Sequence, residues 1–430
     1  MFMMIKKDIG EMLEQGIINT DTAQQIQKYY DDKNESSKNK VFIVFGILGA
    51  LLIGLGLLLI IAHNWMWMSK EIKLTFALTP LLITQLLGGF VVLKKREELL
   101  WREASAILLF FAIGAAISLV SQIYNIAGNI GVFTLVWMLL SLPIFYLLRS
   151  FIVMMMYVVG ITFFTLDAHG LAFPEYQSFY YWPMLLAALP YYLALYKEKH
   201  SGRYLVFMEF LLALSITISV ATLVKDSSEI IYITYFSLFA LLYMLGDLHF
   251  TDKQPWHLKA YRIWGFIGTM VMLYMLSFVW FWDDLATTTF SLSKEFSKPD
   301  IFMSVILFIM AVVLLISNIK KGIWHYYQAV ALVFILFIGI FILGFYSAIS
   351  VVLINIIILF IGIAYVVEGG RKDQLLMFNL GLGIVSIMVV SRFFDTQMSF
   401  VFRGISFVLL GIGLFMANYW MLRKRGENEK

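Results

Sequence analysis

The sequence predicts an all-α integral membrane protein, a polytopic bundle of about fourteen transmembrane helices with the N-terminus and the C-terminus both cytoplasmic. Three observations carry this prediction: the composition, the spacing of the apolar runs and the distribution of the basic residues. Of the 430 residues, 61% are hydrophobic and 14% are charged, whereas a soluble domain carries about 25% charged residues. So few charges cannot cover the exterior of a soluble protein, and the composition therefore excludes a soluble enzyme.

Residues 1–36 come first and are expected to form a small cytoplasmic helical hairpin, followed by a linker at 37–40. Asp21 and Gln24 have the spacing of a capping box at the start of the second helix. Two interpretations of the hairpin remain open. It is either a cap folded back on the bundle or a docking module for a protein partner.

The apolar residues then occur in runs long enough to cross a bilayer, which takes about 17–25 helical residues. Charged or turn residues bound each run, and the runs together form a transmembrane bundle over 41–421 that is followed by a cytoplasmic tail at 422–430. The expected spans are 41–62, 74–93, 104–122, 132–148, 151–167, 180–196, 204–224, 230–246, 261–282, 301–317, 324–345, 348–367, 375–391 and 401–421. Two separations have the weakest signal: Arg149–Ser150, where two runs nearly touch, and Phe345–Ser350, which carries no charge.

The basic residues test this division into spans independently. With the N-terminus in the cytoplasm, 25 of the 32 Lys and Arg residues fall in cytoplasmic segments and 7 on the opposite side. This asymmetry follows the positive-inside rule. Merging or dropping one span would invert every downstream loop and remove the asymmetry, so both termini are expected in the cytoplasm.

The cysteine count and the net charge exclude several kinds of chemistry. The chain has no cysteine, so it has no disulfide, no thiolate nucleophile and no Cys-ligated metal. Its net charge of +4 predicts no nucleic-acid partner, because the basic residues follow the membrane topology instead of forming a patch. No catalytic residue, metal site or cofactor is expected.

Four short phrases of the sequence are similar to those of one family. They are Gly16-Ile17-Ile18 in the hairpin, Ala62-His63-Asn64-Trp65 after the first run, Ala115–Asn125 (AAISLVSQIYN) with Trp137 and Leu142-Pro143, and Arg392-Phe393-Phe394-Asp395 before the last run. The chain thereby resembles the prokaryotic multi-pass membrane proteins catalogued as domain of unknown function 2157. The resemblance implies a multi-pass protein of a prokaryotic cell membrane, and it implies no reaction.

Polar residues at the ends of the runs gather at the predicted outer face. This candidate outer-face polar site consists of His63, Asn64, Ser118, Gln122, Asn125, Asp167, His169, Arg392, Asp395 and Arg403. Polar groups at membrane depth are costly, so each one is a candidate functional residue.

The third run carries the clearest pattern within this site. Gly114, Ser118, Gln122 and Asn125 are spaced by four, four and three residues, so they share one face of a helix. This stripe either packs against a neighbouring helix or forms the wall of a polar cavity that opens outward.

Charged residues at other run ends have local explanations. Arg392 and Asp395 can pair on one helical face, or an outer arginine can bind an anionic head group. Asp167 and His169 can handle a proton, and they are too few to hold a metal. Glu209 either extends to the inner surface of the membrane or serves as a coupling carboxylate.

Three functions follow from these patterns. The first is a transporter or flippase-like protein for a lipid-like, amphipathic or lipid-linked substrate bound at the outer face. The alternatives are a non-catalytic scaffold or sensor that uses residues 1–36, and an outer-leaflet membrane enzyme that uses Asp167, His169 or Asp283. The lipid bilayer is an expected partner, and the small-residue face of Gly46, Ala50 and Gly54 is expected to pack tightly against either a neighbouring helix or a second copy of the chain.

Overall fold

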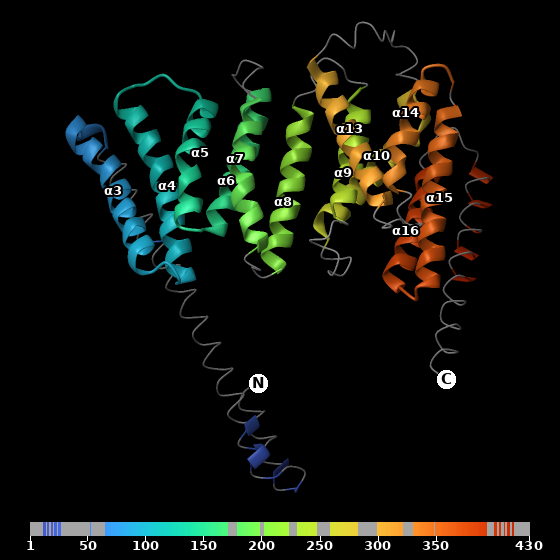
Figure 1. Ribbon diagram of the computed structural model, residues 1–430, viewed down its shortest axis with the longest axis horizontal. Helices are drawn as coiled ribbons and strands as arrows, with labels where there is room; N and C mark the ends of the chain where they lie inside the picture. Colours follow the sequence, from blue (N-terminus) through green and yellow to red (C-terminus); the bar gives the residue numbers. More distant parts are fainter. Residues whose placement is uncertain are drawn as a thin grey trace. The chain divides into compact units, whose positions relative to one another are not determined.

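The fold is known from a computed structural model of the chain (Figure 1). It describes residues 65–170, 179–197, 202–222, 230–246, 259–282, 299–320, 330–347 and 349–393, with scattered positions before and after them. The chain divides into two units, Met1–Thr79 and Pro80–Lys430, and each is described by itself. The predicted linker at 37–40, nearly all of the first span at 41–62 and the tail at 422–430 lie outside the described residues, as does more than half of the last span.

In the first unit, the described part of the hairpin turns at Gly16, which has a φ of 68°. This is the left-handed region in which glycine is unstrained. The next helical residues begin after Asn19, whose side-chain oxygen accepts a hydrogen bond from the Thr22 backbone amide at 2.8 Å. The capping residue is therefore Asn19, two positions before the predicted Asp21. The unit continues through a short 3₁₀ helix, η1 (Trp65–Trp67), into the start of α3.

The described residues form helices and no strand, which confirms the all-helical prediction. The long helices are α3 (Lys70–Lys94), α4 (Leu99–Ile123), α5 (Ile130–Leu147), α6 (Phe151–Gly170), α7 (Tyr181–Lys197), α8 (Gly202–Ala221), α9 (Ile230–Leu245), α10 (Ala260–Leu276), α13 (Pro299–Lys320), α14 (Val333–Gly344), α15 (Ile349–Arg371) and α16 (Leu375–Phe393). Each overlaps one of the expected spans from 74–93 to 375–391. Within the described part of the chain, six of them are long and apolar enough to cross a membrane: α3, α4, α5, α8, α13 and α15.

The uncertain separation at Arg149–Ser150 is a real helix boundary. Arg149 adopts a φ of 52° after the end of α5, and a left-handed residue of this kind ends a helix. The Ser150 hydroxyl then accepts a hydrogen bond from the Val153 amide at 3.1 Å. Ser150 is therefore the N-cap of α6.

The predicted span 261–282 is interrupted. Helix α10 ends at Leu276, and the chain turns at Ser277. The Ser277 hydroxyl donates a hydrogen bond to the Tyr274 carbonyl oxygen at 2.7 Å. The carbonyl of Ser277 accepts a hydrogen bond from Asn355 of α15 at 3.2 Å. A carbonyl released by the break thus finds a partner on another helix, which is how breaks in membrane helices are accommodated.

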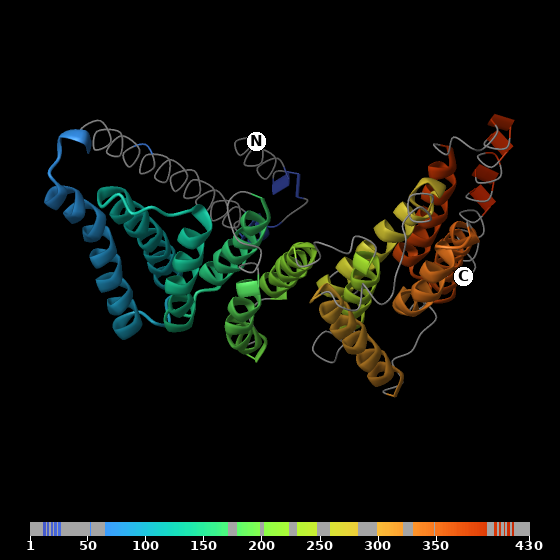
Figure 2. The same cartoon turned by 90° about the horizontal axis from the view of Figure 1, so that it is seen from above.

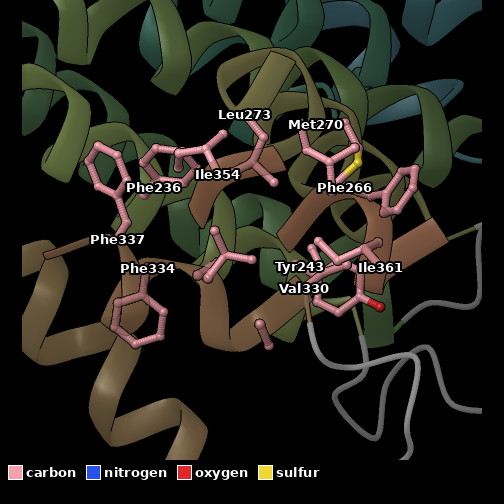
Figure 3. Close-up of a cluster of buried hydrophobic side chains, with 14 of the residues drawn as sticks. Phe236, Tyr243, Phe266, Met270, Leu273, Val330, Phe334, Phe337, Ile354 and Ile361 are labelled. Carbon is pink, nitrogen blue, oxygen red and sulfur yellow. The ribbon is translucent and has the colours of Figure 1, made fainter. Parts of the chain in front are cut away.

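In the second unit, the described helices pack in two groups (Figure 2). Helices α4–α8 enclose one aromatic and aliphatic core around Phe145, Tyr157 and Phe164. Helices α9–α16 enclose a second core around Phe236, Phe337 and Ile354 (Figure 3). A smaller cluster from α8, α9, α10 and α13 links them.

Candidate functional site

A pocket of about 1110 Å³ lies where α4 ends and α5 begins. The loop that joins these two helices is at their top in Figure 1. We call it the α4–α5 pocket. Its lining is Ala116, Ile117, Ser118, Val120, Ser121, Gln122, Asn125, Ile126, Ala127, Gly128, Asn129, Ile130, Val132, Phe133 and Val136. Three residues of the predicted outer-face polar site, Ser118, Gln122 and Asn125, therefore line one cavity.

The loop that forms the rim of the α4–α5 pocket has a defined geometry. Asn125 has a φ of 49°, and its amide donates to the Gln122 carbonyl at 3.4 Å. The Ile126 amide donates to the Ser121 carbonyl at 2.9 Å. These two bonds are the Schellman ending of a helix, in which Asn is one of the few residues that accept the left-handed position.

The predicted small-to-polar stripe on α4 divides into two parts. A Cβ added to Gly114 would lie 2.6 Å from the ring of Trp137 on α5, so Gly114 belongs to a close helix–helix contact. Ser118, Gln122 and Asn125, further along the same face, line the pocket. One part of the stripe is therefore a helix contact and the other part lines a pocket, and the outward opening of that pocket stays a prediction.

An apolar cavity of about 650 Å³ lies beside the α4–α5 pocket, and we call it the apolar groove. Its lining is Phe110, Phe111, Ile130, Phe133, Thr134, Trp137, Met138, Ile152, Met155, Met156, Val159, Gly160, Phe163, Phe207 and Leu211. Ile130 and Phe133 line both cavities. Trp137 is fixed in the wall because its indole Nε1 donates to the Phe110 carbonyl at 2.8 Å.

The polar side chains of the α4–α5 pocket fall into two classes. The Ser121 hydroxyl donates to the Ile126 carbonyl at 3.1 Å, and the Asn129 side chain accepts from the Val132 amide at 3.0 Å as the N-cap of α5. These two groups hold the loop. No hydrogen bond joins the side chains of Ser118, Gln122 or Asn125 to another described residue, and all three are exposed to the pocket.

Glu209 on α8 is buried among the helices, being 2% exposed. Its carboxylate accepts a hydrogen bond from the Tyr196 hydroxyl of α7. The backbone amide of Ala260, the first residue of α10, is directed at the same carboxyl group. Beside it, the hydroxyls of Tyr192 and Tyr261 form a hydrogen bond of 2.9 Å between α7 and α10. The carboxylate thus lies at a helix N-terminus, which favours negative charge.

A second buried carboxylate, Glu103 of α4, was not predicted from the sequence. Its two oxygens accept hydrogen bonds from the amides of Phe151 at 2.9 Å and Ile152 at 3.2 Å, and from the Ser150 hydroxyl. It therefore binds the N-terminus of α6. The signal available in the sequence was the position of Glu103 directly before a predicted span, close to the short turn at Arg149–Ser150.

The remaining predicted site residues are not brought together by the described structure. Asp167 and His169 lie within α6, which continues to Gly170, and Arg392 lies within α16; their side chains are outside the described part. His63, Asn64, Asp395 and Arg403 also lie outside the described residues. Among the residues that are described, no group of three His, Asp or Glu side chains could hold a metal ion.

Comparison with known proteins gives one family match. A family model described as "Predicted membrane protein (DUF2157)" matches residues 11–154. No curated protein and no solved structure shows significant similarity to the chain. The whole α4–α5 pocket lies within the matched residues. The resemblance seen in the first three sequence phrases is thereby confirmed, the phrase at Arg392–Asp395 lies outside the match, and the chain is a helical membrane protein whose N-terminal third is similar to the DUF2157 family of predicted membrane proteins.

Proposed function

We propose that the protein is a transporter or flippase-like protein that moves an amphipathic or lipid-linked molecule between the leaflets of a cell membrane. In this proposal about fourteen helices span the membrane and both termini are cytoplasmic. The α4–α5 pocket then opens at the outer face.

The observation that supports the proposal is a pair of adjoining cavities, one with polar groups set among apolar ones and the other almost wholly apolar. The α4–α5 pocket presents free hydroxyl and amide groups, and the apolar groove presents aromatic and methionine side chains. A molecule with a polar head and an apolar chain matches such a pair, because ligand sites combine mostly apolar walls with a few placed polar groups.

The test is movement of fluorescent lipids in reconstituted vesicles. The protein is placed in phosphatidylcholine vesicles that contain a trace of NBD-labelled glycolipid or NBD-labelled phospholipid, and dithionite bleaches the label in the outer leaflet. We expect the protein to increase the fraction of at least one label that dithionite reaches, relative to vesicles without protein.

Variants connect this movement to the α4–α5 pocket. The combined substitutions Ser118→Ala, Gln122→Met and Asn125→Gly remove the free polar groups, and glycine accepts the left-handed backbone of residue 125. We expect these substitutions to lower the initial rate of lipid movement about tenfold, because loss of a single hydrogen bond to the lipid, worth about 1.4 kcal/mol, weakens its binding by that factor. Gln85→Met, an exposed glutamine of α3 outside the pocket, is the matched control and should keep the wild-type rate. If wild-type protein moves neither label, the proposed function is wrong.

A further inference from the structure

We infer that the α4–α5 pocket takes an uncharged head group that carries hydroxyls, such as a sugar or polyol, whose apolar chain lies in the apolar groove. The inference rests on the proposed function for the biological role of the site. It goes further by naming the class of molecule that binds.

The linings of both cavities contain no charged side chain. None of the residues that line the α4–α5 pocket or the apolar groove is Lys, Arg, His, Asp or Glu. A phosphate or carboxylate removed from water needs a cation or several aligned amides to offset its desolvation. Of the amides at the rim, those of Asn125 and Ile126 already donate to α4 carbonyls and that of Val132 donates to the Asn129 side chain, so these three do not offset such a charge.

The hydrogen-bonding capacity of the lining carries the second step. Ser118 offers a hydroxyl that donates and accepts, and Gln122 and Asn125 each offer a carbonyl oxygen and an NH₂ group. None of these groups bonds to another described residue, so they remain available to a ligand. A sugar hydroxyl also donates and accepts and can satisfy both kinds of group, whereas an ionised phosphate is mainly an acceptor and offers the two amide oxygens at most one donor.

The junction of the cavities carries the third step. Ile130 and Phe133 border both of them, so one molecule can occupy the pocket and the groove together. The ring of Phe133 lies 5.5 Å from that of Trp137, which in turn lies 4.8 Å from that of Phe110. This aromatic wall continues the site from the polar pocket into the groove and suits a hydrocarbon chain.

The experiment is photo-crosslinking of full-length protein in phosphatidylcholine nanodiscs. The probe is an alkyl glucoside with a diazirine in its chain, and the competitors are dodecyl glucoside, dodecyl phosphate and methyl glucoside. We expect label on peptides that contain residues 110–163, with dodecyl glucoside competing at least about tenfold more effectively than dodecyl phosphate. Methyl glucoside should not compete, which separates a lipid-like ligand from a free sugar.

Two pairs of variants test the two halves of the site. Gln122→Met should reduce labelling about tenfold, whereas Gln85→Met should not. Val159→Trp fills the apolar groove and should block labelling, while Leu140→Trp, on the exposed side of α5 outside both cavities, should leave it unchanged. Tryptophan fluorescence during unfolding checks that each variant is folded.

Several results would overturn the inference. Competition by dodecyl phosphate equal to that of dodecyl glucoside would show that the head group is not selected for neutrality. Labelling that survives both Gln122→Met and Val159→Trp in folded protein would place the probe elsewhere. The outcomes remain separable from those of the transport assay. Selective glucoside binding without lipid movement would support the inference and contradict the proposed transport function. Movement of the phospholipid without glucoside binding would support the transport function and contradict the inference.

Discussion

Two buried carboxylates in the second unit lie at the starts of helices from elsewhere in the chain. Glu103 of α4 binds the first amides of α6, and Glu209 of α8 faces the first amide of α10. The first amides of a helix have no partner within it, and the aligned peptide dipoles favour an anion there. Glu103 thus satisfies two backbone amides that would otherwise be costly inside an apolar bundle, whereas Glu209 is bound by the Tyr196 hydroxyl.

Replacing Glu103 should therefore destabilise the bundle. Glu103→Ala leaves the amides of Phe151 and Ile152 without their partner, and we expect a loss of about 2–3 kcal/mol in the free energy of unfolding. Glu98→Ala is the control, since Glu98 forms an exposed ion pair with Lys95 that is worth at most about 1 kcal/mol. Titration with SDS in mixed micelles, followed by tryptophan fluorescence, measures both. Equal losses would contradict the assigned role of Glu103.

For Glu209, the geometry favours a structural role over proton coupling. Glu209→Gln keeps an oxygen for Tyr196 and removes the charge at the N-terminus of α10, so we expect a loss of about 1 kcal/mol in stability and an unchanged rate of lipid movement. Glu97→Gln, at an exposed position, should change neither quantity. Unchanged stability together with lost dependence of transport on a pH gradient would instead identify Glu209 as the coupling carboxylate.

At the scale of single elements, glycines determine how closely two helices approach. On α16, a Cβ on Gly381 would lie 2.6 Å from the Val366 amide nitrogen and 2.7 Å from the Gly362 carbonyl oxygen of α15. Both are backbone atoms, which cannot move aside without separating the helices. Small residues at such contacts are the usual means of tight packing between membrane helices.

Two glycines of α16 provide a matched comparison. Gly381→Ala should lower the free energy of unfolding by about 1–3 kcal/mol, because it overpacks the contact with α15. Gly383→Ala introduces a methyl group with nothing within 4 Å and should raise stability by up to about 1 kcal/mol through better helix propensity. The same SDS titration distinguishes them, and similar effects of the two substitutions would contradict the close packing of α15 and α16.

At the scale of the whole molecule, the second unit consists of two helix groups joined mainly through α8 and α10. Part of this joint is polar: the Trp264 indole donates to the Thr217 hydroxyl at 3.0 Å, and Tyr192 bonds Tyr261. These side-chain hydrogen bonds connect the two helix groups. Transporters commonly move two such groups against each other around a central site.

The predicted topology is testable because the chain has no cysteine, so each introduced cysteine is the single thiol. In intact cells, a membrane-impermeant maleimide should label Gly128→Cys and Tyr346→Cys, at loops predicted to lie outside. Glu97→Cys and Gln374→Cys, at exposed positions predicted to lie inside, should react only after permeabilisation. Residues 97 and 128 flank α4, and residues 346 and 374 flank α15. Labelling of both members of either pair in intact cells would show that the helix between them does not cross the membrane.

The predictability of the site differs among its residues. Ser118, Gln122 and Asn125 could be grouped from the sequence because they recur on one face of a single helix, and helical spacing is a local property. Glu103 could not be paired, since its partners lie 47–49 residues further along the chain. The apolar groove was equally hidden, because its lining comes from α4, α5, α6 and α8.

The sequence by itself determined the all-helical membrane class, the approximate limits of the helices from α3 to α16 and the polar end of α4. These properties follow from apolar run length and from periodicity within one segment. Only the tertiary structure decided that Gly114 packs against Trp137 while Ser118 opens to a cavity, that α10 stops at Leu276, and that Glu103 binds the N-terminus of α6. Those outcomes depend on which side chains from distant segments meet, and a linear pattern of hydropathy holds no information about that pairing.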